Sequence, residues 1–316
     1  MTKVTNALAT YDVTTNREDL SDAVYRISPT DTPFVSSVPR AKATAVLHEW
    51  SLDALATPST ANAQLEGDAL TRSSSTSPSR VQNYCQILKQ DATVSGTQQA
   101  VNPAGIGNMM AFQMAKKSLE QRRDLEATLL ANQGQAAGNT TTARKLRSFN
   151  AWISGNGSRG ANGADSTAVT AAATDGTAGD IRTLTETIFK DAIKDAFEDG
   201  GQPTMALVGA FNKQVISGFT GRSSSREMVS EDKILGAASV YASDYGNIKI
   251  VPNRTQRDRD CYLVDPTKVA VAYLRAFVPS EMGTVGDATT RAIYTEATLE
   301  MRAADAHAGI FDLATS

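Results

Sequence analysis

One segment of the sequence has a glycine spacing that could bind a dinucleotide. Residues 155–160 read GNGSRG, which matches the GxGxxG fingerprint of nucleotide-binding folds letter for letter. That fingerprint requires a helix beginning at the third glycine and an acidic residue about twenty positions later. Here the glycines continue into ANGADSTA instead. We therefore predict a flexible surface loop at this segment and no cofactor.

Residues that could support acid–base or metal chemistry are equally sparse. The two histidines, His48 and His307, lie neither in an HExxH motif nor beside a cysteine. A histidine in the middle of a strand is typically half-buried and hydrogen-bonded, which is our prediction for His48. Asp258 and Asp260 alternate with arginines in RTQRDRD, a pattern that indicates self-neutralised surface charge. We predict no catalytic, cofactor-binding or metal-binding residue, so an enzyme is the weaker functional class.

Composition and charge restrict the possible partners. The 316 residues are 41% hydrophobic, enough to bury one large core or two smaller ones. The formal net charge is −3, so the chain lacks the basic excess that strong nucleic-acid binding requires. Cys85 and Cys261 lie far apart and outside any CxxC motif, which favours a reducing, intracellular origin over a disulfide framework or zinc site. Long apolar stretches and an apolar leader are both missing, so we expect neither membrane insertion nor secretion.

The N-terminal part of the chain combines a predicted helix with a segment that is both proline-rich and apolar. A short amphipathic helix is predicted over residues 16–27, and it runs into the proline-rich YRISPTDTPFVSSVPR of residues 25–40. Its prolines exclude a helix or a central strand, yet the segment is too apolar to lie in water. We therefore expect Phe34 and Val38 to pack on a neighbouring subunit or beneath the chain's own long helix.

Two strand-like segments, residues 43–55 and 82–95, bracket a polar tip. Between residues 56 and 80 the only large apolar side chains are Leu65 and Leu70. Such a tip cannot bury enough surface to order itself, which favours another chain as its partner. The longest helix is predicted next, over residues 105–133, with a length of roughly 40 Å.

The remaining sequence predicts a mixed second domain and a strand that returns to the first. A strand is expected over residues 145–153, and a helix capped by Asp180 is expected with Ile181, Leu184 and Ile188 facing inward. Further strands are predicted over residues 205–208, 240–245, 247–251, 261–264 and 269–274, and a helix over residues 210–218. A final strand over residues 290–301 is long enough to cross back into the first half of the molecule.

Several ordered motifs along nearly the whole chain resemble one known family. They are EDLSDAVYRISPTDTPFVSSV, HEW, NYCQI, VSGTQQAV, RRDLEATLLAN, KLRSFNAWISGN, YASDYGNIKIVPNR, CYLVDPTKVAVAYLRAF and GDATTRAIYTEATLEMRAADAHAGIFDL. In order and spacing they resemble the major capsid proteins of tailed bacteriophages with the Hong Kong 97-type fold, specifically the uncleaved heads of Salmonella-type phages. Ser148 stands where this pattern leads us to expect glycine.

The resemblance implies an α+β fold with five parts. These are an N-terminal arm (residues 1–43), an extended β-hairpin loop (44–96), a peripheral domain with a long spine helix (97–153), a mixed α/β axial domain (154–287) and a C-terminal strand returning to the peripheral domain (288–316). It implies a structural protein whose hexamers and pentamers close an icosahedral shell around phage double-stranded DNA. The candidate inter-subunit contacts are Pro33, Phe34, Val35, Val38, Trp50, Leu65 and Leu70.

The implied partners follow from that function. They are other copies of the chain, a separately encoded scaffolding protein, a portal and a decoration protein, with only weak non-specific contact to the packaged DNA. Assembly is expected in the host bacterial cytoplasm and residence in the virion, without cofactor or membrane. Two other classes stay open: a nanocompartment shell of the same fold that encloses protein cargo, and a phage-associated enzyme or adhesin.

Overall fold

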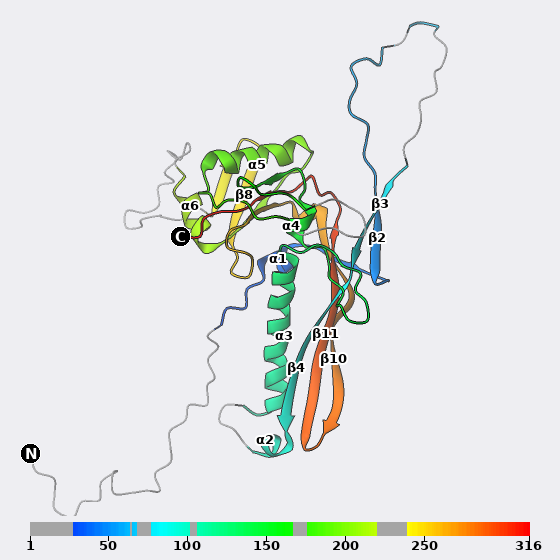
Figure 1. Cartoon of the computed structure of the whole chain (residues 1–316), viewed down its shortest axis with the longest axis vertical. Helices are drawn as coiled ribbons and strands as arrows, with labels where there is room; N and C mark the ends of the chain where they lie inside the picture. The colour runs from blue at the N-terminus through cyan, green and yellow to red at the C-terminus, as the bar shows by residue number, and fades with distance from the viewer. Residues whose placement is uncertain (1–27, 64, 68–76, 102–105, 167–175, 220–238) are drawn as a thin grey trace, which may run out of the picture.

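The computed structural model describes residues 28–63, 65–67, 77–101, 106–166, 176–219 and 239–316. It has two lobes joined by a shared hydrophobic cluster, and a hairpin that extends away from both (Figure 1). The upper lobe has a further cluster of its own. The helix predicted over residues 16–27 and the start of the proline-rich segment lie outside the described residues.

The lower lobe in Figure 1 is a four-stranded sheet. Its strand order is β1-β10-β11-β4, in which β1 runs parallel to β10 and the other pairs are antiparallel. The bounds are Arg40–Lys42 (β1), Gln86–Ser95 (β4), Val269–Val285 (β10) and Ala288–Met301 (β11). Because β11 lies between β10 and β4, the strand predicted over residues 290–301 does return to the first half of the chain, as expected.

Strand β10 continues well past residue 274, where the sequence pattern ends. The pairing with β11 shifts register after Tyr273 and again before Val278, and Phe277 has a φ of +39°. These irregularities interrupt the side-chain alternation that marks a strand in sequence. Most of residues 269–285 therefore belong to the sheet of β4 and β11, although the predicted axial domain ran to residue 287.

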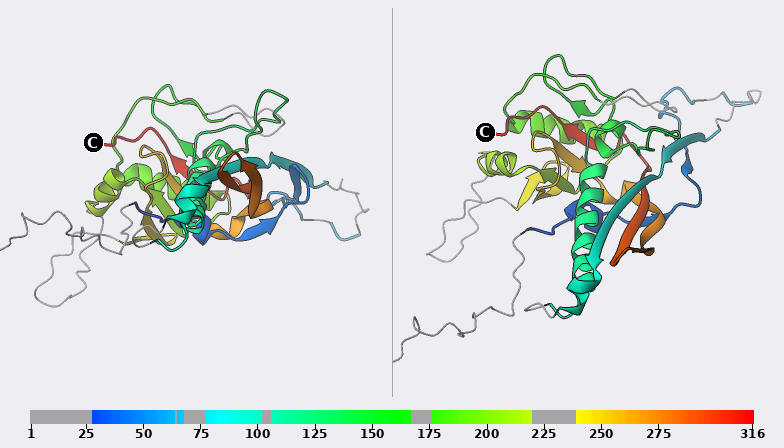
Figure 2. Two further views of the ribbon diagram at one scale, coloured as in Figure 1. Left: turned by 90° about the horizontal axis from the view of Figure 1, so that it is seen from below. Right: turned by 60° about the horizontal axis from the view of Figure 1, so that its bottom comes forward.

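The long helix α3 spans Met109–Leu129, inside the predicted range of 105–133. Asn108 begins it, and the Asn108 side chain accepts a hydrogen bond of 2.9 Å from the Ala111 amide. Leu125 and Leu129 are fully buried in the shared core. The right view of Figure 2 shows α3 lying along β4, so the helix covers one side of the lower lobe.

The two long strands predicted around the polar tip are three strands in the structure. β2 (Leu47–Leu52) pairs antiparallel with β3 (Ser79–Tyr84), and this pair forms the base of the projecting hairpin (Figure 1). After Cys85 the chain changes sheet, because β4 pairs with β11 and then ends in the short helix α2 (Gly96–Ala100). The hairpin thus ends near residue 84. The predicted hairpin, which ran to residue 96, wrongly included β4, a strand of the lower lobe.

The upper lobe is a six-stranded sheet with two helices. Its order is β5-β12-β9-β6-β8-β7, in which β6 and β8 run parallel. The bounds are Gly157–Ser158 (β5), Met205–Val208 (β6), Val240–Ser243 (β7), Gly246–Pro252 (β8), Cys261–Val264 (β9), Ala308–Ile310 (β12), Glu186–Glu198 (α5), Ala210–Ser217 (α6) and the 3-10 turn Pro266–Lys268 (η2). β6, β9 and α6 match their predicted ranges closely, while β12 lies in the segment predicted to return to the peripheral domain.

The helix predicted to begin at Asp180 begins later. Thr185 caps α5, since its Oγ1 accepts a hydrogen bond of 3.3 Å from the Ile188 amide. The residues before it pair with the C-terminal segment instead, where the Arg182 amide donates to the Asp312 carbonyl at 2.8 Å. Ile181 is 61% exposed and does not face inward as expected.

Residues 145–153 contain a short helix and not the predicted strand. The helix α4 spans Phe149–Trp152, and all four of its residues are buried. Leu146 and Ile153 on either side are buried as well. A segment that is buried on every side gives the same apolar pattern as a buried strand, so periodicity could not separate the two.

The glycine-rich segment is packed into the upper lobe and is not the flexible surface loop we predicted. The Arg159 side chain is only 6% exposed; its Nε lies 2.6 Å from the Asp165 carboxylate, and its guanidinium lies 4.1 Å from the ring centroid of Phe311. A Cβ at Gly160 would lie 1.9 Å from the carbonyl oxygen of Asp180, so the backbone of Asp180 packs directly against Gly160. In a nucleotide-binding fold, a phosphate group would occupy that space. No helix begins at Gly160.

Candidate functional site

The apolar part of the arm forms a small helix against the core. α1 spans Pro33–Ser37, although we predicted neither helix nor strand there. The proline is tolerated because it occupies the first turn, where its missing N–H would have no partner within the helix. Phe34 is fully buried, its ring is 5.6 Å from that of Phe149, and Val35 and Val38 lie in the same core cluster. Of the two predicted supports, a neighbouring subunit or the chain's own long helix, the structure shows the second.

A buried carboxylate on α3 completes the docking of α1. Glu126 accepts hydrogen bonds of 2.8 Å from the backbone amides of Phe34 and Val35, one on each carboxylate oxygen. Hydrogen bonds to a charged acceptor contribute roughly 1.5–3 kcal/mol each, which offsets part of the cost of burying the charge. Burial raises the pKa of Glu126, and the hydrogen bonds act in the opposite direction. The sequence placed Glu126 in a charged run and gave no sign of this role.

The base of the hairpin is held by a second set of contacts. The Trp50 indole N–H donates to the Met301 carbonyl at 2.8 Å, and its ring lies 5.7 Å from that of Trp152. His48 Nε2 lies 3.1 Å from a Glu300 carboxylate oxygen, so His48 is half-buried and hydrogen-bonded as predicted. Trp50, predicted as an inter-subunit contact, therefore lies at the junction of the hairpin with its own body.

Asn83 fixes the other strand of the hairpin. Its side chain is fully buried and donates to the carbonyls of Arg147 at 3.1 Å and Leu299 at 2.8 Å. The Arg147 amide donates back to Asn83 Oδ1 at 2.7 Å. One amide side chain thus joins β3 to β11 and to the segment before α4. Sequence reasoning missed it because Asn83 looks like any polar residue of an alternating strand.

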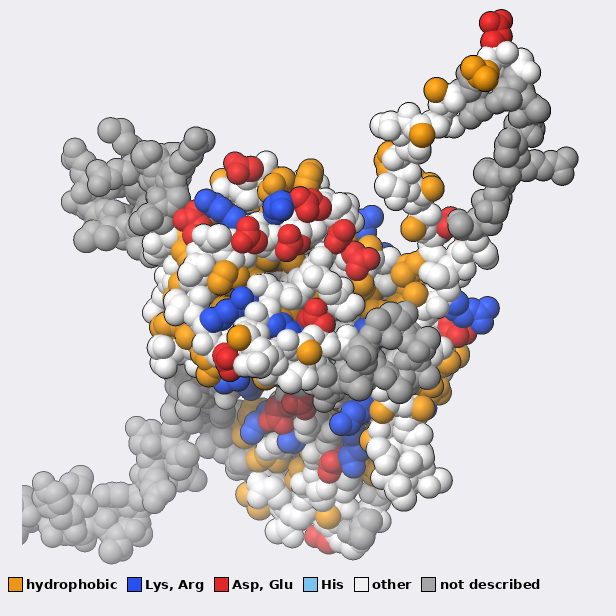
Figure 3. All heavy atoms as spheres, turned by 45° about the horizontal axis from the view of Figure 1, so that its top comes forward, with side chains coloured by type: hydrophobic (Ala, Val, Ile, Leu, Met, Phe, Trp, Pro, Cys, Tyr) orange, Lys and Arg blue, Asp and Glu red, His pale blue; other side chains and the backbone are white. Residues whose placement is uncertain are grey.

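The described residues of the hairpin tip, 53–63, 65–67, 77 and 78, show no comparable buried hydrogen bond to the body. Leu55 is 97% exposed and Leu65 is 80% exposed. The described part of the tip stands clear of the body in the space-filling view (Figure 3). Leu70 lies outside the described residues. Leu55 and Leu65 are thus exposed apolar side chains outside the described hydrophobic clusters of the chain.

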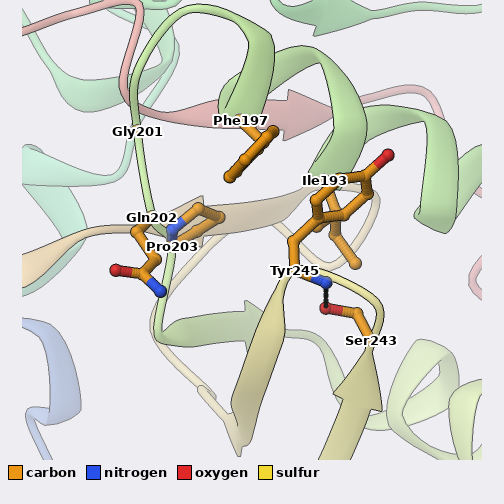
Figure 4. Close-up of a pocket in the computed structure, with 7 residues that line it drawn as sticks. All are labelled: Ile193, Phe197, Gly201, Gln202, Pro203, Ser243 and Tyr245. Atoms are coloured by element: carbon orange, nitrogen blue, oxygen red, sulfur yellow. Dashed lines mark hydrogen bonds between the residues drawn. The ribbon is translucent and has the colours of Figure 1, made fainter.

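An aromatic pair of one exposed and one partly buried ring lies on the upper lobe and was not predicted. Phe197 on α5 is 49% exposed, and its ring centroid lies 4.6 Å from that of Tyr245 in the turn between β7 and β8. Figure 4 shows these side chains converging with Ile193 and Pro203 on a shallow pocket. The space between these side chains is too small to hold a water molecule, so it is no binding site for a ligand.

Groups with the chemistry of an active site are buried apart from any such pocket. Asp260 is fully buried, contrary to the predicted surface charge, and accepts a hydrogen bond of 2.9 Å from the Tyr262 hydroxyl. Burial raises the pKa of Asp260. His307 accepts a hydrogen bond of 3.1 Å from the Asp265 amide, and burial lowers its pKa to about 4. In the described part of the chain, no cluster of His, Cys, Asp or Glu could hold a metal ion, and no helix is long and apolar enough to cross a membrane.

The chain is similar to known capsid proteins in sequence. The family model for the SU10 major capsid protein matches residues 4–314. The major capsid protein of Escherichia phage Phieco32 is 31% identical over 125 residues, which is 40% of this chain and 36% of that protein's own length. The aligned region thus spans about a third of this curated relative.

Solved structures share the fold along nearly the full length. A chain of Gordonia phage Cozz has a TM-score of 0.63 at 9% identity, with 99% of this chain and 98% of that one covered. A chain of the cyanophage A-1(L) capsid asymmetric unit has a TM-score of 0.61 at 13% identity, with coverage of 98% and 99%. The SrpI encapsulin of Synechococcus elongatus is less similar, with a TM-score of 0.52, 11% identity and coverage of 95% and 93%.

These likenesses establish the fold and the family together. The phage neighbours share the Hong Kong 97-type fold, which is the α+β fold that the sequence motifs implied. The matched family consists of structural shell proteins and not of enzymes. Its match extends over almost the whole chain, including the arm, the hairpin and the returning strand. The chain therefore belongs to the SU10 major capsid protein family.

Proposed function

We propose that this protein is the subunit of a viral head: copies of the chain form the hexamers and pentamers of an icosahedral shell that encloses phage double-stranded DNA. The observation that supports this most strongly is the family match over residues 4–314. A second support is the hairpin tip, which carries Leu55 and Leu65 into solvent with no described contact to its own body.

The proposed contact surfaces differ from those first expected. Leu65 remains a candidate inter-subunit contact, and the exposed Phe197, which packs on the partly buried Tyr245, joins it as a candidate on the upper lobe. Phe34, Val35 and Val38, which we first expected at an inter-subunit contact, are buried in the core of a single chain. The upper lobe corresponds to the proposed axial domain, and the lower lobe with α3 to the proposed peripheral domain.

Further partners are proposed on weaker grounds. A formal net charge of −3 suits a shell wall that makes only weak, non-specific contact with packaged DNA. A separately encoded scaffolding protein, a portal and a decoration protein remain proposals from the family resemblance. Assembly in the host bacterial cytoplasm, followed by residence in the virion, belongs to the same proposal.

The test is to express the full chain in bacteria and to combine size-exclusion chromatography with negative-stain electron microscopy. We expect hollow, closed shells tens of nanometres across. A monomer or a small discrete oligomer at every protein concentration contradicts the proposal.

The encapsulin likeness keeps a nanocompartment shell as the second candidate function. Its support is the shared fold alone, at 11% identity. Particles purified from the native source distinguish the two, because a phage head protects double-stranded DNA from nuclease whereas a nanocompartment contains protein cargo and no genome.

A further inference from the structure

Glu126 joins three segments of the chain through one buried carboxylate. Its Oε1 accepts hydrogen bonds from the Phe34 amide and from Asn253 Nδ2, and its Oε2 accepts one from the Val35 amide, each at 2.8 Å. The side chain is fully buried, and no described Lys, Arg or His forms an ion pair with it. The negative charge is thus compensated by N–H donors alone, and those donors come from α1 and from the upper lobe.

The position of α1 depends on that carboxylate. The preceding Thr32 makes no side-chain capping bond, and Pro33 has no N–H, so the amides of Phe34 and Val35 are the first that need an acceptor. Both amides are buried, and an unmet buried amide is costly. Because each amide bonds a different carboxylate oxygen, the pair fixes the direction of α1 as well as its place.

The upper-lobe donor is itself held rigidly. Asn253 follows β8, and its backbone amide donates to the Val208 carbonyl at 2.9 Å. Its Oδ1 accepts a hydrogen bond of 2.9 Å from the Thr255 amide, which leaves Nδ2 directed at Glu126. Glu126 therefore bonds to a fixed point of the upper lobe while it holds α1.

We infer that Glu126 is a positioning residue for assembly: it fixes α1, α3 and the upper lobe in one relative orientation, and that orientation sets the curvature of the shell. The inference rests on the proposed function. In a closed shell of identical copies, the angle between neighbours follows from the shape of each copy, so a small change inside the subunit changes the whole particle.

The substitution Glu126→Gln tests this with almost no change in size. A glutamine side chain offers one acceptor oxygen and places an N–H₂ group against a remaining donor, so at least one of the three hydrogen bonds is lost. We expect hydrogen exchange at the Phe34 and Val35 amides to become at least about tenfold faster, while exchange in the middle of α3 stays unchanged. We also expect shells of mixed size, open sheets or tubes in place of uniform closed particles.

The matched control is Glu120→Gln on the same helix. Glu120 lies on the exposed side of α3, where its carboxylate is 2.7 Å from Lys117 Nζ. This control should leave both the exchange rates and the shells unchanged. If E126Q exchanges at the wild-type rate, or forms shells as uniform as those of the control, the inference is wrong. If the wild type itself forms no shells, the proposed function fails, while the exchange comparison still shows whether Glu126 holds α1.

A second variant covers the case in which E126Q does not fold. Asn253→Ala removes the upper-lobe donor and leaves both amide contacts of α1 in place. We expect a broader range of shell sizes with unchanged exchange at Phe34 and Val35. Uniform shells from Asn253→Ala overturn the coupling between Glu126 and the upper lobe.

Discussion

The arm helix and the hairpin tip share one feature in sequence and differ in the structure. Both contain apolar side chains without a local partner. Phe34 of the arm helix is fully buried between α3 and α4, whereas Leu65 of the tip is 80% exposed. An apolar segment without local support can therefore be completed by its own chain or by another, and sequence pattern alone does not separate the two cases.

The two segments also differ in their hydrogen bonds to the rest of the chain. The arm helix has two buried amides that need an acceptor, and Glu126 supplies it from 92 and 91 residues away in sequence. In the described part of the tip, the hydrogen bonds are local ones, such as that of 3.2 Å from the Ala61 amide to Ser59 Oγ. The arm helix is thus part of the subunit core, and the described part of the tip is not. This contrast supports the proposal that the tip contacts another subunit.

The largest effect is expected from truncating the arm helix. Phe34→Ala removes a fully buried ring that packs against Phe149, so we expect the free energy of unfolding to fall by about 3–5 kcal/mol. Chemical denaturation of the subunit measures this, with the exposed Ser37→Ala as the control. A loss below about 1 kcal/mol would mean that the arm helix is not part of the core. For the same reason, removal of residues 1–40 should destabilise the subunit and not simply prevent assembly.

A pH effect should appear in the same core. Burial lowers the pKa of His307 to about 4 from its ordinary value of 6.5, so the unfolded chain binds a proton at pH values where the folded chain does not. Stability is therefore lost as the pH falls from 6.5 to 4, by about 3 kcal/mol from this group. Denaturation of wild type and His307→Asn across this range isolates the contribution, since the raised pKa values of Glu126 and Asp260 act in the opposite direction in both proteins. Parallel pH profiles for the two proteins would contradict the assignment.

A smaller loss is expected where the hairpin joins the body. Asn83→Ala leaves the Arg147 amide and the Leu299 carbonyl without their side-chain partner, which should cost roughly 1–3 kcal/mol. Arg80→Ala on the same strand is the control, because Arg80 makes only an exposed ion pair of 3.7 Å with Glu49. Equal losses from the two substitutions would show that the base is no better supported than the tip.

The smallest effect on the subunit should come from the tip itself. Replacing residues 56–76 by a short Gly–Ser linker removes Leu65 but keeps β2 and β3, so the thermal midpoint of the subunit should hardly change. Shell formation should be lost, as seen by electron microscopy. A large fall in the thermal midpoint would show that the tip packs on its own subunit after all.

The sequence predicts those parts of the fold in which local periodicity and chain punctuation agree. The long helix α3, the strands β6 and β9 and the helix α6 have strong patterns bounded by caps, glycines or prolines. The family was recognisable because many motifs occur in order, which a single motif such as GNGSRG could not have shown. The last glycine of GNGSRG, Gly160, allows two backbone segments to pack closely together.

Contacts between residues far apart in sequence could not be predicted in this way. The change of sheet at Cys85 leaves the alternation of the strand intact, so nothing local marks the end of the hairpin. The roles of Glu126, Asn83 and Asp260 depend on partners that only the fold brings within hydrogen-bond distance. In sequence each of these residues is a polar side chain of an ordinary helix, strand or loop.

The most direct test of this account is a cryo-electron microscopy map of the assembled shell. We predict that Phe34 stays in the core of its own subunit, with its amide on Glu126, and that the hairpin tip around Leu65 is seated on a different subunit. A map in which Phe34 inserts into a neighbouring chain, or in which the tip folds back on its own body, would contradict the account.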